Sequence, residues 1–236
     1  MKTNTEYKNA ALAALKGNWA PAVLVTVVYL LIALLVVAPS EVPMLNGAMD
    51  DYTSMAASGD IEGMMNAYSR ATSWSSLGTI LQIFLLNVIA IGFTVSFLKL
   101  FRNGDDRLTS NMFQVAFSNY WHKVWGMFLM YVFIILWSLL LIIPGIVKSF
   151  SYAMTPYILE ENPELSANDA IDHSRAMMKG HKFDLFWLYL SFIGWGILCI
   201  FTLGIGFLWL IPYMQTAEAA FYEDVKAEYE LHGGLV

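Results

Sequence analysis

Long runs of apolar residues alternate with short polar segments along the whole chain. The clearest runs extend over 20–38, 77–98 and 124–143, and a longer one extends over 183–222. About 20 apolar residues are needed to cross a hydrocarbon core about 30 Å thick. The last run is too long for one crossing, and its interruption at 202–206 contains Gly204 and Gly206, which favour a turn. The pattern therefore predicts two helices there and five spans so far.

A sixth candidate span, 146–159, follows the Pro144-Gly145 break and either crosses the membrane or lies on its surface. If it crosses, most basic residues fall on the side of the N-terminus: Lys2, Lys8, Lys16, Lys99, Arg102, Arg107, Lys123, Arg175, Lys179, Lys182 and Lys226. If it does not cross, Arg175, Lys179 and Lys182 move to the outside. The turn near Gly204 then lies inside in their place and carries no basic residue. Because short cytoplasmic loops are enriched in Lys and Arg, we expect six spans with both termini cytoplasmic.

The segment 39–76 is then the one sizeable external loop. It carries five acidic residues against a single basic one, Arg70; the acids are Glu41, Asp50, Asp51, Asp60 and Glu62. An acidic external loop agrees with the charge rule. The remaining connections are short, so we expect residues 1–236 to form a single integral membrane domain.

Composition supports this class of protein. The chain is 58% hydrophobic and only 14% charged, with a mean hydropathy of +0.55, well outside the average for soluble domains. The first apolar run has no small-residue cleavage pattern after it, which favours a retained span. No basic run suits nucleic acid. The single cysteine, Cys199, excludes an internal disulfide and any multi-cysteine metal site.

The polar segments also suggest an internal repeat. Three times, an amphipathic stretch ends at a small or polar break, at 16–19, 118–123 and 179–183, and a hairpin of two apolar segments follows. The units cover about 5–104, 105–164 and 165–225. In the third, Ala167, Ala170, Ile171 and Ser174 share one helical face, and Ser166 and Asp169 suit a capping box. We expect an all-α polytopic bundle of three helical hairpins with interfacial amphipathic helices, although any polytopic protein alternates polar and apolar segments.

The stretch 143–159, Ile-Pro-Gly-Ile-Val-Lys-Ser-Phe-Ser-Tyr-Ala-Met-Thr-Pro-Tyr-Ile-Leu, resembles a bacterial membrane family catalogued as domain of unknown function 975. The resemblance includes 14–19, 162–163, 174–175, 178–182, 190–195 and 203–206. It implies a bacterial inner membrane protein and carries over no activity. The proline-glycine hairpin followed by a Ser-Arg helix also bears a weaker likeness to the membrane domain of glycerophosphodiester phosphodiesterases, whose catalytic domain has no counterpart here.

Lys148 is the most informative single residue, because ionisable groups inside spans often mark sites for substrate, ions or lipid headgroups. Its long stem could also carry the ammonium back to the headgroups. Around it, Ser149, Ser151, Tyr152 and Tyr157 make this the most polar of the six helices, so we expect it to face a wet cavity or the bundle interior. These five residues are the candidate lipid or ligand contacts.

Four further polar residues interrupt apolar segments, and we expect them to form hydrogen bonds between helices: Gln82, Asn87, Gln215 and Glu218. Asp172-His173-Ser174 offers hydrolase residue types, but consecutive helix residues point about 100° apart and cannot converge. Asp169 and His173 lack an evident third metal ligand. The sequence therefore predicts no catalytic, cofactor-binding or metal-binding residues.

The function indicated is a noncatalytic integral membrane protein that binds lipid or a partner. The alternative is a small-solute transporter or channel with its polar fourth helix around Lys148. We expect membrane lipids as partners, leave open a protein partner or a homo-oligomer, and expect no nucleic acid. The expected location is the cell membrane.

Overall fold

The computed structural model describes residues 2–45, 48–66 and 82–231, and the elements in these ranges are helices with no strand. The chain divides into two compact units, one formed by Met1–Val28 with Val88–Val236 and the other by Tyr29–Asn87. Four helices among the described residues are long and apolar enough to cross a membrane: Trp19–Val36, Phe84–Asn103, Tyr120–Leu139 and Lys182–Phe201. The chain is therefore an all-helical protein with membrane-compatible segments, as the hydrophobic pattern predicts.

The unit Tyr29–Asn87 contains most of the segment predicted as an external loop. Helix α2 (Trp19–Leu45) continues well past residue 39, and α3 (Ala48–Ser58) follows it. The described part of 39–76 is thus mostly helical, and its position outside the membrane stays a prediction. The α3 sequence contains Ala and Met, which are good helix formers, and has no Pro or Gly. Gly59, with a φ of 73°, follows its last residue.

Each of the three predicted breaks contains one residue in the left-handed conformation. Helix α1 (Asn4–Leu15) is followed by Gly17, α6 (Leu108–Phe117) by Asn119 and α10 (Ala167–Met177) by Gly180, with φ values of 87°, 44° and 96°. A positive φ ends a helix and turns the chain. Each amphipathic helix is therefore separated from the next apolar helix by a turn of similar backbone conformation.

The hairpin at the middle of the chain begins its return earlier than predicted. Helix α7 (Tyr120–Leu140) and α8 (Ile142–Ser151) are separated by Leu141 alone, so Pro144 lies inside α8 and not at a break. Proline is tolerated in a first helical turn because those N–H groups need no partner within the helix. Gly145 lets the two helices approach closely, since a Cβ there would lie 2.9 Å from the Cα of Ser138. After a turn, α9 (Thr155–Glu161) completes the hairpin.

The third predicted unit has similar interruptions. Helices α11 (Lys182–Leu190) and α12 (Ile193–Phe201) are followed by a turn at 202–206, where Leu203 and Gly204 have positive φ values of 53° and 86°. Helix α13 (Phe207–Leu231) then returns. The predicted division of the long apolar run at 202–206 is confirmed.

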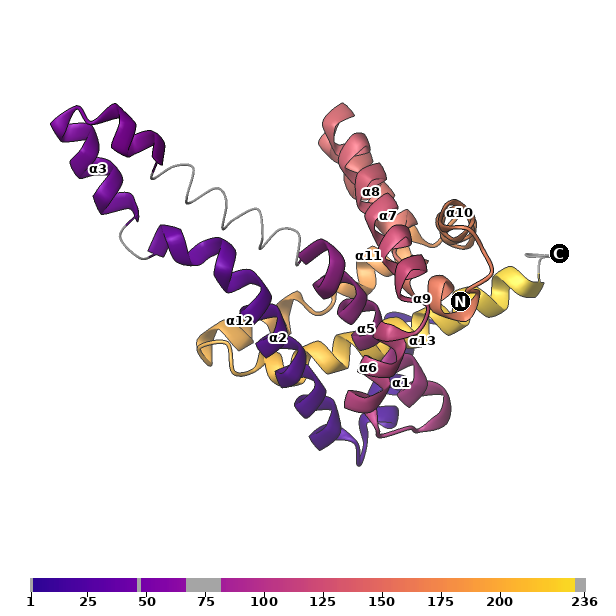
Figure 1. Cartoon of the computed structure of the whole chain (residues 1–236). Coiled ribbons are helices and arrows are strands. Elements are labelled where there is room, and N and C mark those ends of the chain that lie inside the picture. The colour runs from indigo at the N-terminus through magenta and orange to yellow at the C-terminus, as the bar shows by residue number, and fades with distance from the viewer. Residues whose placement is uncertain (1, 46–47, 67–81, 232–236) are drawn as a thin grey trace. The chain divides into compact units, whose positions relative to one another are not determined.

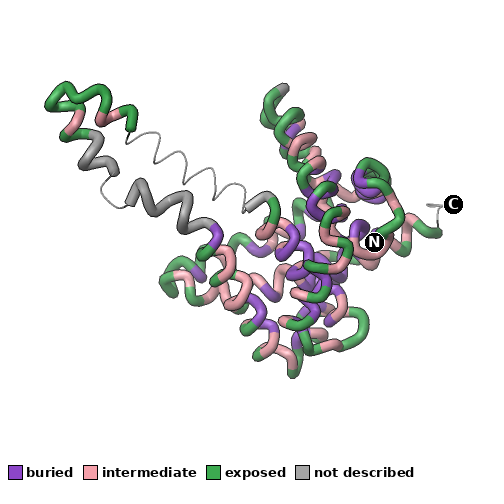
Figure 2. The backbone as a smooth tube through the Cα atoms, in the orientation of Figure 1, coloured by how far each residue is buried: buried purple, intermediate pink, exposed green. Residues whose placement is uncertain are grey.

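The core of the larger unit gathers around α13, which contacts α1, α10, α11 and α12. Its buried residues include Tyr7, Leu98, Tyr157, Ile171 and Phe221, which come from five different helices. The predicted face of α10, made by Ala167, Ala170, Ile171 and Ser174, is the buried one. Exposed apolar residues gather instead at the end of the α7–α8 hairpin, where the two helices lie side by side (Figures 1 and 2).

Charged side chains join helices that are far apart in sequence. Glu161 accepts hydrogen bonds from Tyr222 at 2.6 Å and Lys226 at 2.7 Å, and it pairs with Arg102, which also pairs with Glu223. We call these five residues the Glu161 cluster. It connects α5 (Asn87–Asn103), α9 and α13 through ionic contacts at the ends of α5 and α9.

Lys123 is a second buried ionic contact, with a side chain that is 0% exposed. Its ammonium donates to the carbonyl of Val115 in the last turn of α6 and to that of Ser118, which follows the helix. It also pairs with Glu160 at 2.6 Å. A cation at a helix C-terminus satisfies carbonyls that lack partners within the helix. Lys123 therefore fixes the end of α6 against α9.

Candidate functional site

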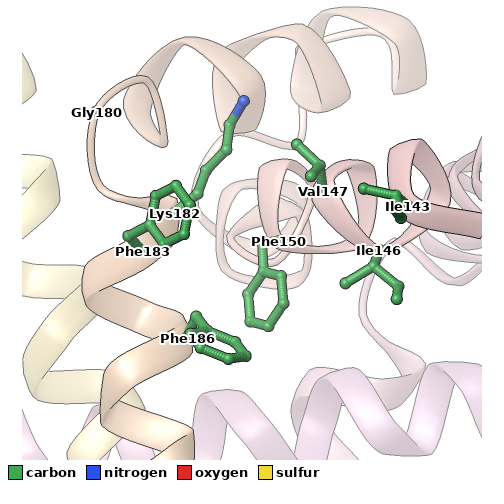
Figure 3. Close-up of a pocket in the computed structure, with 8 residues that line it drawn as sticks. All are labelled: Ile143, Ile146, Val147, Phe150, Gly180, Lys182, Phe183 and Phe186. Atoms are coloured by element: carbon green, nitrogen blue, oxygen red, sulfur yellow. The ribbon is translucent and has the colours of Figure 1, made fainter.

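An apolar groove lies between α8 and α11 in the larger unit. Its volume is about 530 Å³, within the usual range for small-molecule sites. The lining side chains are apolar apart from one lysine: Ile143, Ile146, Val147 and Phe150 from α8, and Gly180, Lys182, Phe183 and Phe186 from α11 and the turn before it. Figure 3 shows the two sets facing each other, with the Lys182 ammonium directed away from the apolar side chains.

The α8 wall follows from helical spacing. Ile143, Ile146, Val147 and Phe150 stand at positions i, i+3, i+4 and i+7 and so form one stripe. Phe150 packs edge-on against Phe186 at 5.9 Å between ring centroids and lies 6.2 Å from the ring of Tyr189. The inner end of the groove is therefore aromatic, while Ile143 and Phe183 are each 75% exposed at its outer parts.

One cationic side chain lines the groove, and two others lie on α8 and α10. Lys182 lines it directly, and Lys148 on α8 interacts electrostatically with Lys182 and with Arg175 of α10. Arg175 pairs with Asp172 at 3.1 Å, with both side chains more than half exposed. In the described part of the chain, neither lysine has a carboxylate within ion-pair distance. The groove thus combines apolar walls with a local excess of positive charge.

Lys148 itself does not project into a polar cavity. Its ammonium lies 4.4 Å from the centre of the Trp137 ring on α7 and 5.9 Å from that of Tyr152. An ammonium over an aromatic face is stabilised by the electrostatic attraction of the ring. The structure therefore brings Lys148 and Tyr152 together around Trp137, which sequence reasoning did not single out.

The other candidate contacts are dispersed. The Ser149 and Ser151 hydroxyls donate to carbonyls of their own helix, those of Ile146 at 2.7 Å and Val147 at 2.8 Å. Tyr157 is 0% exposed in the core, where its ring stacks on that of Tyr222 at 4.4 Å. The five residues therefore do not form one site, and a lipid- or ligand-binding role for each stays a prediction.

The four residues expected to join helices have different surroundings. Glu218 is buried, and Tyr189 of α11 lies near its carboxyl group. The buried side-chain amide oxygen of Gln215 has no hydrogen-bond partner. Asn87 begins α5 and is partly buried, and the side chain of Gln82 lies outside the described residues. The joining of helices by these four residues stays a prediction.

A contact that sequence reasoning missed fixes α10 beside the groove. The Ser174 hydroxyl donates to the Ser151 carbonyl at 3.0 Å and accepts from the Met154 amide at 3.1 Å. It thereby satisfies backbone groups at the turn between α8 and α9. Its position on the buried face of α10 was the available signal, but the sequence does not reveal which backbone it meets.

A second apolar groove, of about 380 Å³, lies between α12, α13 and the ends of α1 and α2. Its lining includes Leu12, Trp19, Trp195, Trp209 and Tyr213, and no charged side chain. Among the described residues, no group of three or more His, Cys, Asp or Glu side chains is placed to hold a metal ion. The α8–α11 groove is thus distinguished from the second groove by its lysine.

Comparison with known proteins gives one match. No curated protein and no solved structure matches the chain. The weaker likeness to the membrane domain of glycerophosphodiester phosphodiesterases is not shown and stays a prediction. A family model described as protein of unknown function (DUF975) matches residues 139–229, which include α8 to α11 and both walls of the groove. Over these residues the chain is similar to the family of unknown function DUF975.

Proposed function

We propose that this chain is a noncatalytic membrane protein that binds an anionic phospholipid in the groove between α8 and α11. The observation that carries the proposal is the juxtaposition of an apolar groove of about 530 Å³ with Lys182 in its lining. Acyl chains fit apolar walls, and a phosphate group is attracted by ammonium groups. The second apolar groove lacks the cation and is the natural comparison.

The position of Lys182 in the chain supports a headgroup site. Lys182 is the first residue of α11 and lies across the groove from Val147 and Phe150 of α8. Lys148 is within electrostatic reach and adds positive charge. A juxtamembrane lysine contributes about 1 kcal/mol to attraction for anionic lipid. The phosphate would therefore lie near Lys182 and the acyl chains along Ile146 and Phe150.

Six spans remain part of the proposal, and helix lengths support them. The segment from Ile142 to Glu161 contains α8, a turn and α9, and at 1.5 Å per residue its 20 residues reach about 30 Å. That length matches a hydrocarbon core of about 30 Å. Helix α13 is longer still. Both segments are therefore long enough to return across the membrane.

The packing of the amphipathic helices supports a threefold repeat. Helix α10 packs on α7 and α9 of the preceding predicted unit, and a Cβ at Gly92 of α5 would lie 2.1 Å from the Met112 carbonyl oxygen of α6. Helix α1 packs on α13, which closes the cycle from the first unit to the last. Each amphipathic helix thus contacts the hairpin of the unit before it, as a pseudo-threefold bundle requires.

The binding role is preferred to transport because of the polar groups of α8. Ser149 and Ser151 direct their hydroxyls to their own helix, and Lys148 lies over Trp137. These side chains offer no continuous polar surface for a solute. A protein partner or a second copy of the chain stays an expectation beside lipid.

The test is lipid retention by the purified protein. Native mass spectrometry and lipid extraction would compare the wild type with Lys182→Gln, with Lys179→Gln as a control because Lys179 is exposed and does not line the groove. Losing about 1 kcal/mol of attraction corresponds to roughly fivefold weaker binding. We expect Lys182→Gln to lose anionic lipid by about that factor while Lys179→Gln retains it. Equal retention by all three proteins would overturn the proposal.

A further inference from the structure

Glu218 is a carboxylic acid in the interior of the larger unit. It lies in the middle of α13 and is 9% exposed. Tyr189 of α11 and Tyr157 of α9 lie near its carboxyl group. Tyr157 is 0% exposed and its hydroxyl has no hydrogen-bond partner. Three helices thus bring two phenols to one buried carboxyl group.

Three cations of the larger unit have other partners, and Lys182 of α11 lines the groove. Lys8 of α1 donates to the Ser191 carbonyl at 2.8 Å, and Arg102 of α5 pairs with Glu161 and Glu223. Lys226, on α13 itself, pairs with Glu161. His173 of α10 lines a small polar cavity beside Glu161 and Tyr222. Within the described residues, Glu218 therefore has no ion-pair partner.

A buried carboxylate without a cation is costly, by several kcal/mol even after the protein relaxes. The cost disappears if the group carries a proton, because the neutral acid is only a polar group with hydrogen bonds to satisfy. The side-chain amide oxygen of Gln215, one turn earlier on α13, is buried and without a hydrogen-bond partner. It could therefore accept the hydrogen bond that such an acid donates. The surroundings of Glu218 therefore suit the protonated form.

The same surroundings can also accommodate the carboxylate form of Glu218. When the carboxyl O–H bond breaks and its proton passes to water, the carboxylate can accept a hydrogen bond from the nearby Tyr189 hydroxyl. Tyr157 has a hydroxyl proton that is free to donate a second bond. A carboxylate with two phenol donors is stabilised relative to one without them. We propose that Glu218 is a proton-binding site that holds a proton at neutral pH and releases it with these two phenols as donors.

The site is connected to the groove through one side chain. Tyr189, which lies near Glu218, also lies against Phe150 at the inner end of the groove. A change in the protonation of Glu218 would reorient Tyr189 and alter that end. This consequence rests on the proposed function, whereas the proton site itself does not.

The experiment is infrared spectroscopy of the whole protein in lipid between pH 5 and pH 9. We expect the C=O stretch of a buried protonated carboxyl group at pH 7 in the wild type, its loss at high pH, and its absence from Glu218→Gln. Glu164→Gln, which changes an exposed carboxyl group, should retain the band. A wild type without this band at pH 7 would overturn the proposal, as would a stabilisation by Na⁺ over choline that Glu218→Gln abolishes.

A second variant keeps the test decisive if Glu218→Gln does not fold. Tyr189→Phe removes a donor to the carboxylate, so the band should persist to higher pH than in the wild type. An unchanged midpoint would contradict the proposed role of Tyr189 and Glu218. Lipid retention measured on the same samples separates the two claims: a titrating band without retained lipid would refute the groove and leave the proton site standing.

Discussion

Glu161 shows how much of this protein depends on single buried charges. Its side chain is 15% exposed and meets Arg102, Tyr222 and Lys226, which come from two other helices. Burial acts to raise the pKa of this carboxyl group, but Lys226, Tyr222 and Arg102 together bring the pKa below its ordinary value of 4.5. Sequence reasoning placed Arg102 and Lys226 on one side of the membrane, yet it could not pair them with Glu161.

This lowered pKa makes a prediction about acid stability. Because the folded pKa lies below the unfolded one, the stabilisation is complete above about pH 4.5 and is lost as pH falls through the folded value. Glu161→Gln should therefore lower the unfolding temperature at pH 7, at a cost of about 1–3 kcal/mol, and should weaken the further loss on acidification. Tryptophan fluorescence during heating at a series of pH values measures both, with Glu164→Gln as the exposed control. An acid response identical to that of the wild type would contradict this role.

At the scale of elements, close helix contacts depend on particular glycines. A Cβ at Gly92 of α5 would lie 2.1 Å from the Met112 carbonyl oxygen and 3.1 Å from the Ala116 amide nitrogen, both backbone atoms of α6. Gly196 of α12 has nothing within 4 Å of the same position. The two glycines therefore have different roles although both lie inside helices.

Alanine substitution separates these roles. Gly92→Ala should push α5 away from α6 and destabilise the protein by about 1–3 kcal/mol, as overpacking does. Gly196→Ala should be neutral or stabilise by up to about 1 kcal/mol, because alanine is the better helix former. Thermal unfolding in one detergent compares the two variants directly. If Gly92→Ala were as stable as Gly196→Ala, the close contact between α5 and α6 would be wrong.

The helices themselves could be largely predicted from the apolar runs, and their partners could not. The breaks at Gly17, Asn119 and Gly180 were expected from polar and small residues, and each contains the positive φ that ends a helix. The start of α8 was predicted too late, because Pro144 reads as a breaker while a first helical turn tolerates it. The apolar stripe of α8 was equally visible, but its pairing with Phe183 and Phe186 depends on packing between helices distant in sequence.

At the scale of the whole molecule, the chain combines membrane-compatible helices, an exposed apolar surface and a groove with a lysine in its lining. The sequence could indicate the membrane class, because about 20 apolar residues suffice for a span. From the sequence, Lys148 was the residue expected at a binding site, and it lies over Trp137. Lys182 was used only to predict the orientation of the chain in the membrane. The lysine that lines the groove became recognisable only once α8 and α11 were side by side.

The most direct measurement is photocrosslinking with a diazirine-bearing phosphatidylglycerol in membranes, followed by mass spectrometry of the labelled peptides. We expect labelling at the α8 and α11 walls, around Ile146 and Phe183. This labelling should decline roughly fivefold in Lys182→Gln. Labelling at the second groove, around Trp195 and Leu198, should not change with that variant, since it has no charged side chain in its lining. Equal labelling of both grooves, unaffected by Lys182→Gln, would contradict a lipid site between α8 and α11.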